Sequence, residues 1–145
     1  MTKRVLVIGG GGREHALVRT LLRSPQAPEV LAAPGNVGIE GDGVECLPGD
    51  DAVAAARERQ VDLVVVGPEA PLVAGLADEC VAAGVPCFGP SAAAARLEGS
   101  KAYAKEVMAA AGVATAGCAV VESVDDGMAA IDGYPAVIKA DGLAA

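Results

Sequence analysis

The sequence predicts an α/β domain with a parallel sheet, and three observations carry this prediction. Short β-branched runs alternate with segments of helical periodicity from the start of the chain to about residue 90. The run at 61–66 is apolar almost without interruption, as expected for a central strand covered on both faces. Turns rich in glycine or proline end these runs. In such a sheet the crossovers are right-handed and ligands bind at the carboxyl ends of the strands.

The expected elements follow one another in a regular order. A first strand at 4–8 leads through Gly9–Gly12 into a helix over 13–23, where apolar residues recur at helical spacing. The other elements expected in this Rossmann-like domain are strands at 30–33, 44–47, 61–66 and 86–88, and helices at 51–59 and 71–83.

The pattern changes near residue 90. Helices are expected at 91–97 and 101–111, then a strand at 118–121, a helix at 124–131 and a strand at 136–139. We therefore expect a domain over 1–98 and the beginning of a second domain over 99–145. Because this second part is too short to bury a core of its own, we expect the chain to be an amino-terminal piece of a longer enzyme.

Composition excludes several classes of protein. The chain has 145 residues, 52% of them apolar and 2% aromatic, with 11 Lys and Arg against 19 Asp and Glu and a formal net charge of -8. This balance excludes a disordered tail and disfavours binding to nucleic acids or to anionic membranes. The sequence contains no apolar run long enough to cross a bilayer and no signal-peptide pattern, so a cytoplasmic location is expected.

The cysteines offer no metal-binding pattern. Cys46, Cys80, Cys87 and Cys118 form no C-x-x-C pair, and the lone His15 lies far from them in sequence. Reduced thiols are expected in preference to two disulfides or a zinc site.

The glycine-rich turn after the first strand predicts an anion site, because glycines let a phosphate approach the backbone and the following helix presents free N–H groups. A dinucleotide fits poorly. The G-x-G-x-x-G pattern begun at Gly9 meets Glu14 at its third glycine, and the frame begun at Gly10 meets His15. The second strand also ends at Ala33-Pro34 without an acid for a ribose hydroxyl. A smaller phosphate ester is favoured, the alternative being a tight turn for close packing of strand and helix.

Two charged residues lie at the start of this helix. Arg13 is unfavourable at a positive helix end, which suggests an anionic ligand; the alternative is a solvated charge paired with Glu14. For His15 a local hydrogen bond is favoured over proton transfer.

Polar residues also follow two further strands. Glu69 comes after the central strand, between Pro68 and Pro71, where it can bind a substrate amine or sugar hydroxyls; the alternative is a helix N-cap or first-turn charge. Asn36 follows the second strand in a Pro-Gly-Asn turn and is a second candidate for substrate binding.

Two lysines stand where a purely structural lysine is not preferred. Lys101 opens one expected helix and Lys139 closes an expected strand. Both are candidates for binding nucleotide phosphates, although for Lys101 a solvated helix end is an equal alternative.

Six ordered blocks of the sequence resemble the glycinamide ribonucleotide synthetase family, also called phosphoribosylamine–glycine ligase, of the ATP-grasp superfamily. The blocks are Gly11-Gly12-Arg13-Glu14-His15-Ala16-Leu17, Ala33-Pro34-Gly35-Asn36, Val66-Gly67-Pro68-Glu69-Ala70-Pro71-Leu72, Phe88-Gly89-Pro90, Leu97-Glu98-Gly99-Ser100-Lys101 and Val137-Ile138-Lys139-Ala140-Asp141-Gly142-Leu143-Ala144-Ala145.

The resemblance implies an activity and a division of roles. ATP phosphorylates the glycine carboxylate, and the amine of 5-phosphoribosylamine attacks the acyl phosphate, which gives glycinamide ribonucleotide in de novo purine synthesis. The resemblance implies that the loop of Gly10, Gly11, Gly12 and Arg13 faces the ribose phosphate. It implies that Glu69 faces the sugar or the amine, and that Lys101 and Lys139 face the nucleotide phosphates.

The resemblance also implies what this stretch of sequence lacks. The magnesium ligands are expected beyond residue 145, no catalytic residue is identifiable within the chain, and the piece is expected to be inactive alone. The alternatives are a non-catalytic module that binds a nucleotide or phosphate ester, and a NAD-dependent oxidoreductase domain. The oxidoreductase needs the third glycine and the acid that are missing here; the module would bind its ligand without ligase activity.

Overall fold

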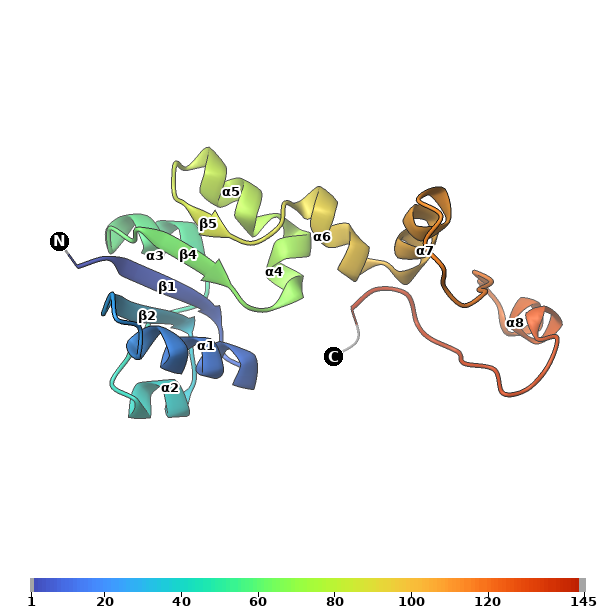
Figure 1. Cartoon of the computed structure of the whole chain (residues 1–145), viewed down its shortest axis with the longest axis horizontal. Coiled ribbons are helices and arrows are strands. Elements are labelled where there is room, and N and C mark those ends of the chain that lie inside the picture. The colour runs from blue at the N-terminus through green and yellow to red at the C-terminus, as the bar shows by residue number, and fades with distance from the viewer. Residues whose placement is uncertain (1, 144–145) are drawn as a thin grey trace. The chain divides into compact units, whose positions relative to one another are not determined.

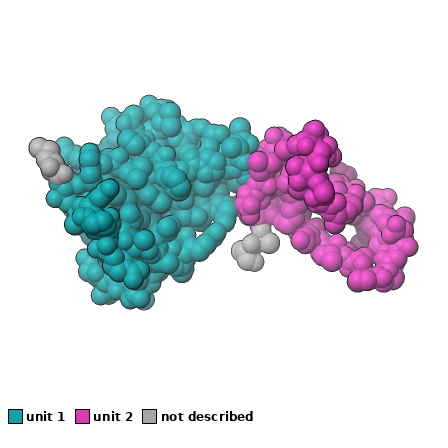
Figure 2. All heavy atoms as spheres, viewed as in Figure 1, with its two compact units in different colours: residues 1–95 teal, residues 96–145 magenta. Residues whose placement is uncertain are grey.

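The computed structural model describes residues 2–143, and the chain divides into two compact units (Figure 2). Unit 1 comprises Met1–Ala95 and unit 2 comprises Arg96–Ala145.

Unit 1 is built on a five-stranded parallel sheet (Figure 1). The strands are β1 (Arg4–Gly9), β2 (Glu29–Pro34), β3 (Glu45–Cys46), β4 (Leu63–Val66) and β5 (Cys87–Phe88). They are arranged in the order β3-β2-β1-β4-β5, with β1 paired to β2 on one side and to β4 on the other. The strand order therefore reverses beside β1, and the predicted parallel α/β fold is confirmed. In sheets of this kind the reversal opens a ligand site at the carboxyl ends of the central strands.

Helices connect the strands of unit 1. They are α1 (Gly12–Leu22), α2 (Val37–Gly41), α3 (Ala52–Glu58), α4 (Glu69–Ala74) and α5 (Leu76–Ala82). The next helix, α6 (Ala92–Gly99), spans the division between the two units, and α7 (Lys101–Ala110) and α8 (Val124–Ala130) belong to unit 2.

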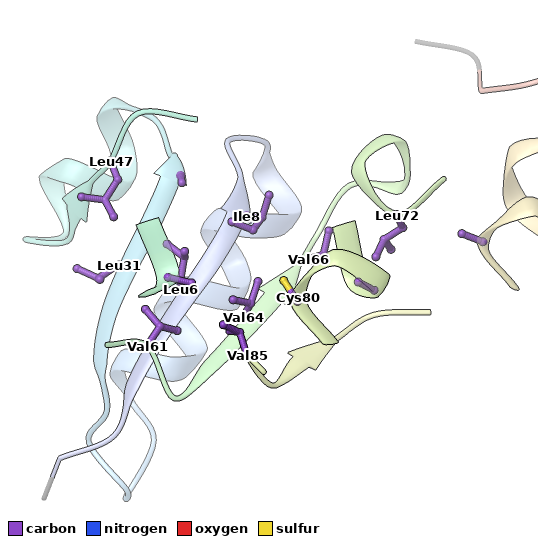
Figure 3. Close-up of a cluster of buried hydrophobic side chains, with 14 residues drawn as sticks. Leu6, Ile8, Leu31, Leu47, Val61, Val64, Val66, Leu72, Cys80 and Val85 are labelled. Atoms are coloured by element: carbon purple, nitrogen blue, oxygen red, sulfur yellow. The ribbon is translucent and has the colours of Figure 1, made fainter. Parts of the chain in front are cut away.

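Helices bury both faces of the sheet. Alternate side chains of each strand point to opposite faces, so each strand contributes to two cores. On one face, Leu6 and Ile8 of β1 pack with residues of α3, α4 and α5, among them Leu72 and Cys80 (Figure 3). On the other face, Val5 and Val7 pack with residues of α1 and α2. Unit 1 is thus a three-layer sandwich, and this packing fixes the loops at the carboxyl end of the sheet.

Two features of unit 1 differ from the expectation. The helix predicted over 71–83 is two helices, because Gly75 takes a left-handed conformation with φ 106° and ends α4 before α5 begins. Helix α2 was not predicted, since its five residues are too few to show a hydrophobic period.

Unit 2 lacks a buried core in the part of the chain that the structure describes: none of residues 96–143 is buried. The strands predicted at 118–121 and 136–139 are wrong, because both segments are irregular and exposed. Val137 and Ile138 are 80% and 85% exposed. A strand requires a partner for its backbone hydrogen bonds, and these segments have none within the described residues of the unit.

A search for membrane-spanning segments among residues 2–143 finds no helix with the length and apolar character that crossing a bilayer requires.

Candidate functional site

Three loops meet at the carboxyl edge of the sheet in unit 1. The loops follow β1, β2 and β4, and backbone hydrogen bonds join them: the N–H of Gly35 donates to the carbonyl of Gly9 at 3.2 Å, and that of Gly67 to the carbonyl of Ile8 at 3.1 Å. The approach of Gly10 to the carbonyl of Gly35 is so close that a Cβ on Gly10 would collide with it. Glycine is therefore required here for the packing of two loops, as well as for any approach of a ligand.

The side chain of Asn36 forms hydrogen bonds to two segments at the carboxyl edge of the sheet. Its side-chain oxygen accepts hydrogen bonds from the N–H groups of Gly38 and Ile39, at 2.8 and 3.0 Å, and thereby caps α2. Its amide nitrogen donates to the carbonyl of Gly10 at 2.8 Å. One side chain thus starts a helix and fixes the glycine loop.

Arg13 and Glu69, the two charged candidates from the sequence, form an ion pair with each other. The guanidinium donates two parallel hydrogen bonds to the carboxylate, 2.7 Å from Nη1 to Oε1 and 3.0 Å from Nη2 to Oε2. Arg13 is the second residue of α1, which follows β1, and Glu69 is the first residue of α4, which follows β4. The pair therefore bridges the ends of the two central strands. The Arg13 side chain remains 68% exposed and that of Glu69 34%. The pair is open to solvent and presents a cation and an anion together.

This ion pair predicts an acid titration. Hydrogen bonds from Arg13 lower the pKa of Glu69 from an ordinary 4.5 to about 2. Since the pKa is depressed in the folded state, its stabilisation is complete above pH 4.5 and is lost as the pH falls toward 2. In Arg13→Ala the carboxyl resonance of Glu69 should titrate near its ordinary value, as measured by carbon NMR between pH 1.5 and 7.

The matched control is Arg19→Ala, which removes another guanidinium of α1 from its partner Asp42 and should leave the Glu69 midpoint unchanged. A midpoint near 2 in Arg13→Ala would contradict the assignment.

Glu14 lies in the first turn of α1 and is buried, whereas the sequence suggests only that it can pair with Arg13. Its side chain is folded back, so that Oε2 accepts a hydrogen bond from the N–H of Gly11 at 2.7 Å. Among the described residues Oε1 has no hydrogen-bond partner. The spacing of three between Gly11 and Glu14 is that of a capping box, and this signal could have located the bond.

His15 and Arg19 join α1 to α2 through Asp42. His15 Nε2 lies 2.8 Å from Oδ2 of Asp42, and Arg19 Nε donates to the same oxygen at 2.6 Å. The hydrogen bonds from Arg19 and then from His15 hold the pKa of Asp42 well below its usual range. His15 is hydrogen-bonded, as expected, but its partner lies 27 residues away and is not local. The network holds the end of α2 at Asp42 against α1, and Asn36 caps the start of the same helix.

In unit 2, Asp141 caps the start of α7. Its Oδ1 accepts hydrogen bonds from the N–H groups of Lys101 and Ala102, at 2.6 and 3.2 Å, and its Oδ2 accepts one from Ser100 Oγ at 2.9 Å. Lys101 Nζ donates to the carbonyl of Gly142 at 2.5 Å. The structure thus brings the segment that carries Lys139 back to the start of α7, while Lys139 itself is exposed. No local pattern predicts the role of Asp141, because it caps a helix that begins 40 residues earlier.

The described residues offer no obvious metal centre. Residues 2–143 contain no group of three or more His, Cys, Asp or Glu side chains placed to hold an ion. The four cysteines are unpaired, and burial raises the pKa of the Cys80 thiol to about 11.

Comparison with known proteins gives the family. The model of the phosphoribosylglycinamide synthetase N domain matches residues 3–98. Phosphoribosylamine–glycine ligases of Streptomyces coelicolor and Mycobacterium leprae are 55% and 53% identical over 98% of this chain. The chain spans about a third of their length, 36% in each case.

Two solved structures share the fold. A phosphoribosylamine–glycine ligase from Thermotoga maritima matches with a TM-score of 0.69 and 33% identity, over 97% of this chain and 33% of that one. A biotin carboxylase domain of a single-chain bacterial carboxylase, 21% identical, matches with a TM-score of 0.64 over 88% of this chain and 33% of that one, and shows the fold alone. On the strength of the family match over 3–98 and of these relatives, the chain belongs to the phosphoribosylglycinamide synthetase family.

Proposed function

We propose that this chain supplies the phosphoribosylamine site of a phosphoribosylamine–glycine ligase, with a boundary near residue 98 before the start of an ATP-grasp domain. The observation that carries the proposal is the Arg13–Glu69 ion pair at the carboxyl ends of β1 and β4. The family match and the strand order support the same place in the fold.

The two charges of the pair match the two ends of 5-phosphoribosylamine. A guanidinium presents parallel N–H donors that suit a phosphate, and a carboxylate accepts hydrogen bonds from an amine or from ribose hydroxyls. Because the pair is exposed, the substrate can replace each partner without uncovering a buried charge. In this proposal Gly10, Gly11 and Gly12 face the ribose phosphate together with Arg13, and Asn36 lies beside the sugar while it holds the loop.

Lys101 and Lys139 are proposed to contact the phosphates of ATP. Both lysines belong to unit 2, and the Asp141 cap brings their two segments together. Bound ATP supplies the phosphoryl group that activates the glycine carboxylate for attack by the substrate amine. The contribution of the lysines is charge neutralisation at the nucleotide, which is the main protein contribution to phosphoryl transfer.

Magnesium is expected with ATP, but the proposal assigns it no ligand here, since residues 2–143 present no acidic cluster for it. The proposal also includes a cytoplasmic location. It includes small-molecule substrates and neither a nucleic-acid nor a membrane partner. A non-catalytic module of the same fold is the second candidate, and it would bind sugar phosphates without ligase activity in the longer protein.

The experiment is Glu69→Gln in a full-length ligase that carries this sequence. The KM for phosphoribosylamine should rise about 10-fold, since a hydrogen bond to a charged group is weakened. The melting temperature should hardly change, because the side chain is partly exposed.

Glu45→Gln is the matched control, since Glu45 of β3 forms the same kind of exposed pair with Arg59 at the end of α3, and it should leave the KM unchanged. A large thermal loss with unaltered kinetics would show that Glu69 only starts α4.

A further inference from the structure

Glu14 stands where a dinucleotide-binding turn has its third glycine. Counted from Gly9, the pattern continues with Gly11 and reaches Glu14. In dinucleotide-binding domains the second glycine lets the backbone approach the pyrophosphate, and the third lets the helix pack closely on the strand. Here the N–H of the second glycine, Gly11, donates to the carboxylate of Glu14 itself. The carboxylate of Glu14 thus occupies the place that the pyrophosphate of a ligand takes in a dinucleotide-binding domain.

The side chain of Glu14 fills the space over the turn. A Cβ on Gly9 would lie 2.6 Å from its Cγ, and a Cβ on Gly11 would lie 2.8 Å from its Oε2. A Cβ on Gly67, in the loop after β4, would lie 2.6 Å from its Cδ. Three glycines from two loops therefore form a cradle for this carboxylate, and Glu14 is only 4% exposed.

One oxygen of this carboxylate is left without a hydrogen bond in the described part of the protein. Oε1 of Glu14 is buried and accepts no hydrogen bond from any of residues 2–143. Unsatisfied buried acceptors are rare in native proteins and call for an explanation. A carboxylate held among Gly9, Gly11 and Gly67 repels a second anion from that place.

We propose that Glu14 is a specificity-determining residue, an internal anion that occupies the glycine turn and excludes the pyrophosphate of a dinucleotide. The inference rests on the proposed function, in which a single sugar phosphate is met by Arg13 and by the glycine loop on its open side at Gly12, where a Cβ would meet nothing within 4 Å. The turn thereby keeps its Rossmann-like shape and loses its affinity for a diphosphate bridge.

The test uses the full 145-residue chain, labelled with nitrogen-15, and ADP-ribose as the dinucleotide probe. Glu14→Gly vacates the cradle and restores the third glycine, whereas Glu14→Gln keeps the volume and removes the charge. Titrated with ADP-ribose, the Gly9–Gly12 amides of the wild type should hardly move. Both variants should bind at least about 10-fold more tightly, and Glu14→Gly most tightly, because both the repulsion and the obstruction are gone.

Glu40→Gln, which removes an exposed carboxylate from α2, is the control for net charge and should behave as the wild type. If Glu14→Gly unfolds, the isosteric Glu14→Gln decides. Affinities for ADP-ribose that stay within about twofold of the wild type in every folded variant would overturn the inference. Titration of the wild type with ribose 5-phosphate separately tests the proposed function, so that the two failures are distinguishable.

Discussion

Gly67→Ala should destabilise unit 1 by about 1–3 kcal/mol, because a methyl group there meets the buried side chain of Glu14. For a unit of this size, this loss corresponds to a fall in melting temperature of roughly 5–20 °C. Glu14 can move away only by breaking its hydrogen bond to Gly11. Thermal unfolding followed by circular dichroism measures the effect.

A second substitution identifies the cause. In the Gly67→Ala background, Glu14→Ala should lower the free energy of unfolding much less than it does in the wild type, since Glu14→Ala removes the side-chain atoms with which the methyl group added at position 67 would collide. Gly41→Ala is the control, because a Cβ on Gly41 meets nothing within 4 Å. A Gly67→Ala variant as stable as the wild type, or a double variant whose losses simply add, would contradict the packing described here.

Lys139→Ala should lower the kcat of a full-length ligase that carries this sequence by about 10²-fold, the usual cost of losing one charge-stabilising group at a reacting phosphoryl centre. Lys139 is exposed and lies outside any helix or strand, so its removal should leave the melting temperature unchanged. The measurement is glycine-dependent formation of ADP.

The control for this substitution is Lys105→Ala. Lys105 belongs to α7 of the same unit, and its Nζ donates to Thr115 Oγ1 at 2.7 Å. Because this ammonium group already bonds within the unit, its removal should leave the kcat unchanged. An unchanged kcat in Lys139→Ala, with saturating ATP, would remove Lys139 from the nucleotide site.

The sequence predicts the sheet of unit 1 well, because its signals are local. The apolar run of β4 and the glycine turn before α1 are each contained within a few consecutive residues. Helix α2 escaped prediction, although Asn36 is a typical N-cap residue, because five residues show no period. The strands at 118–121 and 136–139 failed for the opposite reason: the propensity is present, but no partner strand pairs with them among the described residues.

The candidate site was half predictable. Arg13 and Glu69 follow from the rule that ligands bind at the carboxyl ends of parallel strands. Arg13 and Glu69 lie 56 residues apart in sequence, and that they pair follows only from the strand order, which places β1 beside β4. The burial of Glu14 depends equally on Gly67, in the other loop, and the partner of His15 depends on a helix that was not predicted.

The central claim is that the glycine loop of unit 1 receives a sugar phosphate, and an amide titration tests it most directly. Ribose 5-phosphate added to the nitrogen-15-labelled chain should move the Gly9–Glu14 amides saturably, and NADH should not. Gly12→Val should abolish the shifts, because a branched side chain obstructs the approach of a ligand at a position where a Cβ meets no protein atom within 4 Å. Shifts of these amides with NADH, and none with ribose 5-phosphate, would contradict the account.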